Sequence, residues 1–347
     1  MPLTSSTSRG RRLAVIAAAL GLVMVSVLVA VLIGPVDLPS AAIVRELLAW
    51  VPGVNESGLS DQHRAILWEL RAPRVVLACL VGACLSVSGA AYQGAFRNPL
   101  ADPYLLGAAA GAGLGATLVL VAGSSGPAAG TAMLPIASFL GALGGVALAY
   151  GIGGSMGGRT TTGLVLAGVA VASFLTALQT FVQQRNLDTL REIYTWILGR
   201  LSTAGWSDVW LMLPYAVVSI TVLMLHGRLL DVLGLGDDEA ASLGIAPARV
   251  RLIVVVAASL ATAAAVAVAG LIGFVGIIVP HAVRLVVGTS NRWVVPLSAL
   301  GGAAFLVLAD LAARTLVSPG ELPIGVVTAL LGAPAFALLL RRAGRMA

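Results

Sequence analysis

Three consecutive carboxylates, Asp237, Asp238 and Glu239, are the densest group of acidic side chains in this sequence. Glycines stand on both sides of the group, so it begins a short segment with a break at each end. Acidic side chains in the first turn of a helix interact favourably with the helix dipole. The residues therefore predict a short helix that begins near Asp237 or Asp238, and by themselves they indicate only a capped helix in a loop.

Three arginines, Arg71, Arg74 and Arg314, stand at the ends of apolar segments. Arginine in such a position often extends its charged group to the membrane interface. Arg314 also follows Asp310 by four residues, which is the spacing of an ion pair within one helix. The residues alone predict interfacial anchoring or an intrachain pair, although a planar guanidinium also suits the carboxylate of another protein.

A fixed turn is expected directly after the apolar segment that ends near Phe96. Its sequence contains Asn98-Pro99 and Asp102-Pro103, and residues before proline are disfavoured in helical geometry. On these residues alone, a plain corner between two helices explains the pattern as well as any functional turn.

The composition shows which elements must position these groups. Of the 347 residues, 59% are apolar and 10% are charged, whereas soluble domains carry about 25% charged residues. The apolar runs are continuous, which favours helices over an alternating β-barrel. At about 20 residues per span, the chain accommodates about ten transmembrane helices. We therefore expect an all-α polytopic membrane bundle that forms a single transmembrane domain over residues 1–347.

The successive apolar runs give the approximate positions of the spans. They lie near residues 13–33, 73–96, 104–122, 132–152, 163–183, 207–226, 250–270, 275–288, 293–313 and 324–340. Non-spanning helices are expected at 41–50 and 188–198. An even number of spans returns the C-terminus to the side of the N-terminus, and about thirteen of the 21 arginines then lie inside. Both termini are therefore expected in the cytoplasm.

An internal repeat is also suggested by spacing. Gly89, Pro99 and Gly107 recur as the same residue types 181 positions later. If the two sets are equivalent, the helices that carry them run in opposite directions, and the repeat is inverted, as in many transporters.

Several functions are excluded by missing residue types. The chain contains no lysine, so it cannot carry the lysine of a phosphate-binding loop. Paired carboxylates or a nucleophile with its base are not evident, and the three histidines are scattered, so we expect no catalytic site, no metal site and no cofactor. The net charge of +6 comes from arginines between apolar spans, which argues against nucleic-acid binding.

Four segments in order resemble the FecCD family of ABC importer permeases, which import iron siderophores, haem and cobalamin (vitamin B12). These segments are residues 88–107, 164–170, 274–284 and 321–334. The resemblance covers the chain from about Arg71 onward. It implies a type II ABC importer subunit with ten helices that forms a homodimer in the membrane lipid, with two separate ATPase subunits and an extracytoplasmic substrate-binding protein as partners.

The resemblance also assigns roles to three groups of residues. A coupling segment for the ATPase, within a loop of about residues 233–250, comprises Asp237, Asp238, Glu239, Ala240, Ala241, Ser242, Leu243 and Gly244. The resemblance implies that Arg71, Arg74 and Arg314 dock the binding protein. The cytoplasmic gate comprises Asn98, Leu100 and Thr161.

We therefore expect a permease that imports an iron chelate, a ferric siderophore, across the bacterial cytoplasmic membrane, while another chain hydrolyses ATP. Cobalamin and haem are alternative substrates. An ion-driven secondary transporter is an alternative of another class. Such a transporter usually needs ionisable groups at the membrane centre, and Asp310 is the candidate that the sequence offers, near the outer end of a span.

Overall fold

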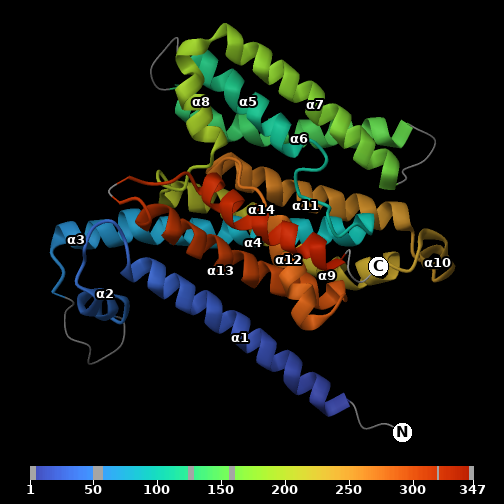
Figure 1. Ribbon diagram of the computed structural model, residues 1–347, viewed down its shortest axis with the longest axis horizontal. Helices are drawn as coiled ribbons and strands as arrows, with labels where there is room; N and C mark the ends of the chain where they lie inside the picture. Colours follow the sequence, from blue (N-terminus) through green and yellow to red (C-terminus); the bar gives the residue numbers. More distant parts are fainter. Residues whose placement is uncertain (1–4, 50–57, 124–128, 156–160, 319, 344–347) are drawn as a thin grey trace.

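Ten apolar helices form the body of the computed structural model, which describes residues 5–49, 58–123, 129–155, 161–318 and 320–343 (Figure 1). Within these residues, seven helices are long and apolar enough to cross a membrane and three are shorter. The ten are α1 (Ser5–Leu32), α4 (Ala72–Phe96), α5 (Ala108–Gly123), α6 (Ala129–Ser155), α7 (Thr161–Arg185), α9 (Trp206–Leu233), α11 (Pro247–Ala269), α12 (Val275–Val287), α13 (Asn291–Thr315) and α14 (Ile324–Ala343). They coincide with the ten predicted spans.

Shorter helices lie at the two ends of the bundle. α2 (Ser40–Leu47) and α8 (Leu190–Ile197) correspond to the two predicted non-spanning helices. α10 (Asp237–Ser242) is the predicted acidic helix. The sequence did not predict α3 (Asp61–Ala65), nor the π-helical turn Ile66–Arg71, which joins α3 and α4 into one continuous helix of 36 residues.

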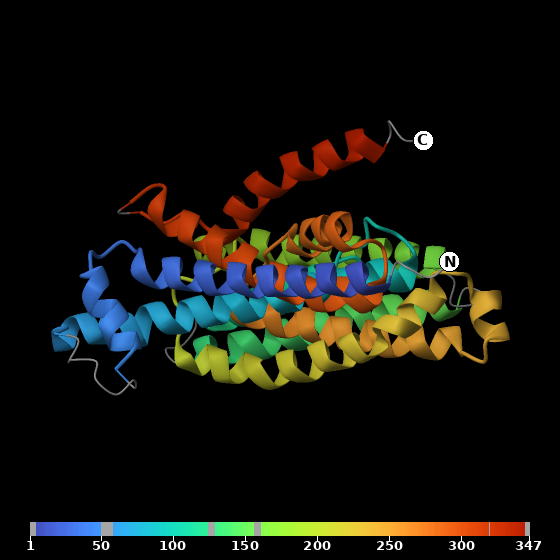
Figure 2. The same cartoon turned by 90° about the horizontal axis from the view of Figure 1, so that it is seen from below.

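The start of α1 and the end of α14 lie at the end of the bundle that carries α10, and α2 and α3 lie at the opposite end (Figures 1 and 2). These are called the α10 end and the α2 end below. A hydrogen bond from Arg11 Nη2 to the carbonyl of Val286, 3.2 Å long, joins the start of α1 to the end of α12. The two termini therefore share one side, as an even number of spans requires, and the assignment of that side to the cytoplasm stays a prediction.

The central helix α4 packs against its neighbours through glycines. A Cβ atom built on Gly89 lies 1.9 Å from the carbonyl oxygen of Gly276 in α12, and one built on Gly82 lies 2.2 Å from that of Gly302 in α13. Real side chains do not tolerate such distances. Small residues at helix crossings allow membrane helices to approach closely, so these glycines set the spacing of α4, α12 and α13.

Two of the connections between consecutive spans are non-helical segments that pack within the bundle. Residues 97–107 follow α4 and lead to α5, and residues 270–274 follow α11 and lead to α12. The hydroxyl of Tyr104 accepts a hydrogen bond from the amide of Ile272 at 3.2 Å and donates one to its carbonyl at 3.1 Å. Irregular backbone is tolerated at membrane depth when protein surrounds it, and Ala101 and Leu106 are fully buried.

Helices α4 and α11, which precede the two non-helical segments, run in opposite directions. The predicted repeat of residues at a constant offset is nevertheless wrong. α4 runs toward the α10 end and α11 runs away from it, so the two pairs of elements are inverted. Gly89, however, lies inside α4, whereas Gly270 caps α11 with a φ of +71°. Pro99 lies in a turn, whereas Pro280 lies inside α12. The constant offset of 181 residues therefore does not relate equivalent positions of the two pairs of helices.

Candidate functional site

α10 is a short helix with defined ends. Gly236 precedes it with a φ of +138°, and Gly244 follows it with a φ of +79°. The amide of Gly244 donates to the carbonyl of Ala241 at 2.9 Å, and the amide of Ile245 donates to that of Ala240 at 3.1 Å. This pair of bonds is the Schellman arrangement, which requires a left-handed residue and so favours glycine at 244. The helix is therefore held in shape at both ends.

One face of α10 is open to solvent at the α10 end of the bundle. Asp238, Glu239 and Ser242 are exposed, and Leu243, directly after the helix, is 61% exposed. Ala240 alone of the helix residues is buried, so it anchors the opposite face. An exposed leucine beside two carboxylates offers both apolar area and charge to another protein.

Asp237 differs from its acidic neighbours because it is paired within the chain. Its Oδ1 atom lies 3.3 Å from Nη2 of Arg97 and 3.0 Å from Nη2 of Arg251. Arg251 is buried, and its Nε donates to the carbonyl of Ala95 in α4 at 3.3 Å. Asp237 therefore joins the start of α10 to the end of α4 and to α11, and neither arginine was singled out for this role from the sequence.

The predicted gate begins at the same end of α4. Arg97 caps the helix in the left-handed region, with a φ of +50°. Oδ1 of Asn98 accepts a hydrogen bond from the amide of Leu100 at 2.9 Å, so this side chain stabilises the turn, and the side chain of Leu100 is exposed. Thr161 begins α7, and its side chain lies outside the described residues. The gating role of these residues stays a prediction.

Two of the three predicted docking arginines are buried at the α2 end. Arg71 is 4% exposed and donates through Nη1 to the carbonyls of Val31 and Leu32 at 3.0 and 3.3 Å. Arg314 is 1% exposed, donates to the carbonyl of Ala30, and has its Nε 3.6 Å from Oδ2 of Asp310. The last carbonyls of a helix have no partner within the helix, and these guanidinium groups supply one for α1.

The third predicted docking arginine, Arg74, is also paired within the chain. Nη2 of Arg74 lies 2.8 Å from Oδ1 of Asp310, and its Nη1 lies 3.0 Å from Oε1 of Glu321. The Arg74 side chain is 12% exposed and borders a cavity of about 190 Å³ that Arg200 and Glu321 also line. Of the three arginines, Arg74 is the one that remains accessible at this end, and docking stays a prediction.

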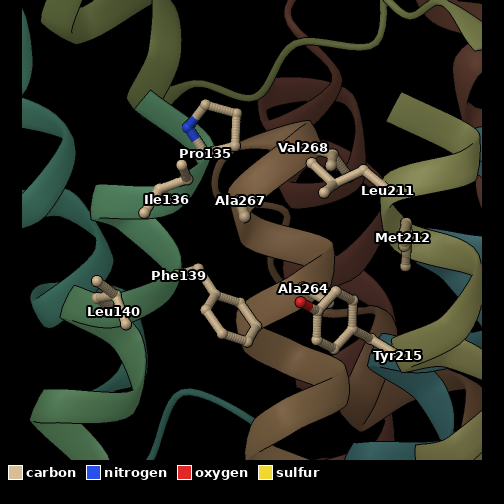
Figure 3. A pocket seen from close by; sticks show the side chains of 10 residues that line it. All are labelled: Pro135, Ile136, Phe139, Leu140, Leu211, Met212, Tyr215, Ala264, Ala267 and Val268. Carbon is tan, nitrogen blue, oxygen red and sulfur yellow. The ribbon is translucent and has the colours of Figure 1, made fainter. Parts of the chain in front are cut away.

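A separate pocket of about 140 Å³ lies between α6, α9 and α11 (Figure 3). The rings of Phe139 and Tyr215 face one another in it, with centroids 5.2 Å apart. Apart from the hydroxyl of Tyr215, the side chains that line it are apolar. It offers no charged partner for a polar cargo, so we assign it no part in transport.

Comparison with known proteins identifies the family to which the chain belongs. The sequence profile of the FecCD transport family matches residues 22–342. The chain belongs to the FecCD transport family. One relative of this FecCD protein is the ABC transporter permease YvrB of Bacillus subtilis, described as uncharacterized, which is 42% identical over 92% of this chain and 91% of the relative. The cobalamin import permease BtuC of Halobacterium salinarum is 41% identical over 82% of this chain and 75% of its own. The iron(3+)-hydroxamate import permease FhuB of Bacillus subtilis is 41% identical over 81% of this chain and 72% of its own.

A solved structure extends the comparison to three dimensions. An ABC transporter described as of the metal-chelate type, in an inward-facing conformation, superposes with a TM-score of 0.82 at 28% identity and covers 95% of this chain and 99% of that one. The FecCD protein is therefore an all-helical polytopic membrane protein with the type II ABC importer fold. It is the permease subunit and not itself an ATPase, and family membership excludes the ion-driven secondary transporter.

Proposed function

We propose that this FecCD permease imports a ferric siderophore. The observation that carries the proposal is the 41% identity over 281 residues with a permease named for an iron(3+)-hydroxamate, together with the metal-chelate description of the superposed structure. Cobalamin is the second candidate, because a permease named for it is equally identical over a similar length. Both cargoes are large chelates, and the permease needs no metal ligands of its own for a metal that arrives already bound.

We infer that the exposed face of α10 docks on an ATPase subunit. Its carboxylates, Asp238 and Glu239, and its exposed Leu243 provide the contact, while the pair of Asp237 with Arg97 and Arg251 transmits a displacement of α10 to the end of α4. The turn at Asn98 and Leu100 follows α4 directly, so such a displacement reaches the proposed gate. Two copies of the chain form the pathway between them in this proposal, with both termini in the cytoplasm.

Docking of an extracytoplasmic binding protein is assigned to Arg74 alone of the three arginines. The guanidinium of Arg74 borders the cavity at the α2 end. When the binding protein docks, one of its carboxylates can replace Glu321 as the ion-pair partner, so the charge of Arg74 stays compensated. Replacement of Arg74 by Glu is expected to lower the affinity for the binding protein, and a reversed charge on the partner is expected to restore part of it. Arg191 on α8 is an exposed control at the same end. An equal loss on reversal of Arg191 contradicts specific docking.

Transport assays with reconstituted vesicles distinguish the candidate cargoes. The permease is reconstituted with its ATPase and with the binding protein encoded beside it, and uptake of a labelled ferric hydroxamate is measured against labelled cobalamin and haem. We expect ATP-dependent uptake of the ferric hydroxamate. Uptake of cobalamin or haem alone assigns the other substrate, and ATP-independent uptake driven by an ion gradient contradicts the importer mechanism.

A further inference from the structure

A long groove runs between α1, α12 and α13, and it has two chemically different parts. A hollow of about 150 Å³ at the α10 end adjoins an apolar hollow of about 400 Å³ that extends toward the middle of the bundle. Val15, Val286, Val287 and Leu297 line both hollows, so the two are continuous. α1 lies along the outside of the bundle, so the groove faces the surroundings of the protein (Figures 1 and 2).

Basic side chains surround the end of the groove. Arg11 and Arg12 line the smaller hollow together with Trp293. The Cζ atoms of Arg12 and Arg292 each lie 5.2 Å from the centre of the Trp293 ring. Tryptophan and arginine are typical of the membrane interface, where the ring lies at the level of the lipid headgroups.

The charge of these arginines is not neutralised by carboxylates. Among the residues that the structure describes, no ion pair involves Arg11, Arg12 or Arg292. Asp231 is close by, but its carboxylate accepts hydrogen bonds from the hydroxyl of Ser290 and from the amide of Asn291 at the start of α13. Arg11 and Arg12 at the mouth of the groove, and Arg292 beside Trp293, therefore carry positive charge without a carboxylate partner among the described residues.

The deeper part of the groove suits a hydrocarbon chain. Ala18 and Leu22 of α1, Ile278 and Ala282 of α12, and Phe305 of α13 line it without an ionisable group. These helices are among the ten apolar spans, so this part of the groove lies at the depth of the acyl chains. A soluble anion gains no favourable contact in this apolar part, whereas a phospholipid fills both parts of the groove at once.

We propose that this groove binds an anionic phospholipid. The headgroup phosphate lies among Arg11, Arg12 and Arg292, and one acyl chain lies between α1 and α12. Basic pockets between membrane helices recognise anionic headgroups in this way, and anionic lipids are enriched in the cytoplasmic leaflet, where the α10 end is expected to lie. The lipid then joins α1 to the rest of the bundle along a face that side chains leave open.

Binding of lipid to the purified, full-length chain in detergent tests the proposal. Native mass spectrometry compares phosphatidylglycerol with phosphatidylcholine of the same acyl chains. We expect preferential binding of phosphatidylglycerol, and Arg11→Gln with Arg12→Gln is expected to weaken it by roughly 30-fold, since each arginine near the headgroups contributes about 1 kcal/mol. Arg228→Gln removes an exposed arginine outside the groove and is expected to leave binding unchanged.

A second variant separates the lipid from other occupants. Ala282→Trp fills the apolar hollow and keeps every arginine, so it is expected to weaken phosphatidylglycerol binding while inorganic phosphate at millimolar concentration fails to compete. A photoreactive residue at position 18 is expected to form an adduct with the mass of a phospholipid. Equal binding of the two lipids, competition by inorganic phosphate, or a cross-link to a second copy of the chain overturns the proposal.

Discussion

The carboxylate of Asp237 is shared by two arginines that belong to different parts of the chain. Arg97 is 140 positions earlier and Arg251 is 14 positions later, so the pair cannot be found from helical spacing. Arg251 is buried, and a buried charge without a partner costs free energy. The pairing therefore fixes the start of α10 relative to α4 more firmly than the backbone alone does.

Replacement of Asp237 by Asn is expected to uncouple transport from ATP hydrolysis. The change keeps the size of the side chain but removes the charge that holds Arg97 and Arg251, and because Asp237 is partly exposed we expect a modest loss of about 1–2 kcal/mol in unfolding free energy. Uptake and ATPase rates in reconstituted vesicles are the measurement. Asp188→Asn, at an exposed aspartate outside α10, is the matched control for charge. Uptake per ATP that stays at the wild-type value contradicts the role of this pair.

Replacement of Arg314 by Gln is expected to destabilise the protein, because the buried guanidinium donates to the carbonyl of Ala30 near the end of α1 and lies beside Asp310. A loss on the order of 3 kcal/mol in unfolding free energy follows from removal of one member of a buried charged pair. Thermal unfolding in detergent measures it, with exposed Arg191→Gln as control. If Arg314→Gln leaves the unfolding temperature unchanged and lowers only binding-protein affinity, direct docking by Arg314 is correct instead.

The sequence singled out the arginines at the ends of the spans, but it did not predict most of the groups that these arginines contact. Arg71 and Arg314 were singled out by position and by type, but their burial depends on α1, which lies hundreds of residues from Arg314 in the sequence. The i,i+4 pair of Asp310 and Arg314 was correct because local spacing determines it. Glu321, which pairs with Arg74, lay within a segment that carried the family resemblance, yet nothing in that segment indicated its partner.

At the scale of the elements, the crossing of α4 with α12 limits what can replace Gly89. Gly89→Ala is expected to lower the unfolding free energy by about 1–3 kcal/mol, because the new methyl group overlaps the backbone of Gly276 and the helices must move apart. Thermal unfolding in detergent checks this. Gly144→Ala in α6 has open space around its Cβ and is expected to be neutral or slightly stabilising. Equal effects of the two substitutions refute the packing argument.

The contact between the two non-helical segments gives a second prediction at this scale. Tyr104→Phe removes both hydrogen bonds to the backbone of Ile272 without changing the ring, and leaves that amide and carbonyl without this partner. We expect a loss of about 1–2 kcal/mol in unfolding free energy and faster hydrogen exchange at Ile272, measured by mass spectrometry. Unchanged exchange at Ile272 shows that the hydroxyl does not hold the two segments together.

Hydropathy predicted the spans because a membrane demands about 20 apolar residues whatever the tertiary structure. It did not predict that α4 continues to Asp61, since Arg64 and Glu69 interrupt the apolar pattern there. It did predict the short α12, since the expected span 275–288 matches a helix of 13 residues, about 20 Å long. It began the third span at residue 104, whereas α5 begins at Ala108, because residues 104–106 are apolar enough to look like part of a span. The length of the non-helical segment after α4 is therefore the part of this fold that hydropathy did not predict.

For the whole molecule, the clearest prediction concerns ATP. The purified chain is expected to show no ATPase activity, since it has no lysine for a phosphate-binding loop, and activity is expected only when an ATPase subunit is added. Phosphate release by the isolated chain, compared with the reconstituted complex, is the measurement. Glu239→Arg is expected to reduce the activity of the complex, whereas hydrolysis by the clean permease contradicts the assignment of this chain as the transport subunit.

The bond between Arg314 and the end of α1 also bears on how the protein is made. The two residues that it joins are 284 positions apart. At about 5–20 residues per second, a ribosome needs roughly 15–60 s to travel that distance. Throughout that interval Arg71 is available to the carbonyls of Val31 and Leu32, but Arg314, the partner of the Ala30 carbonyl, has not been synthesised. A nascent chain released before residue 314 therefore lacks one of the two guanidinium groups that join the end of α1 to the rest of the bundle.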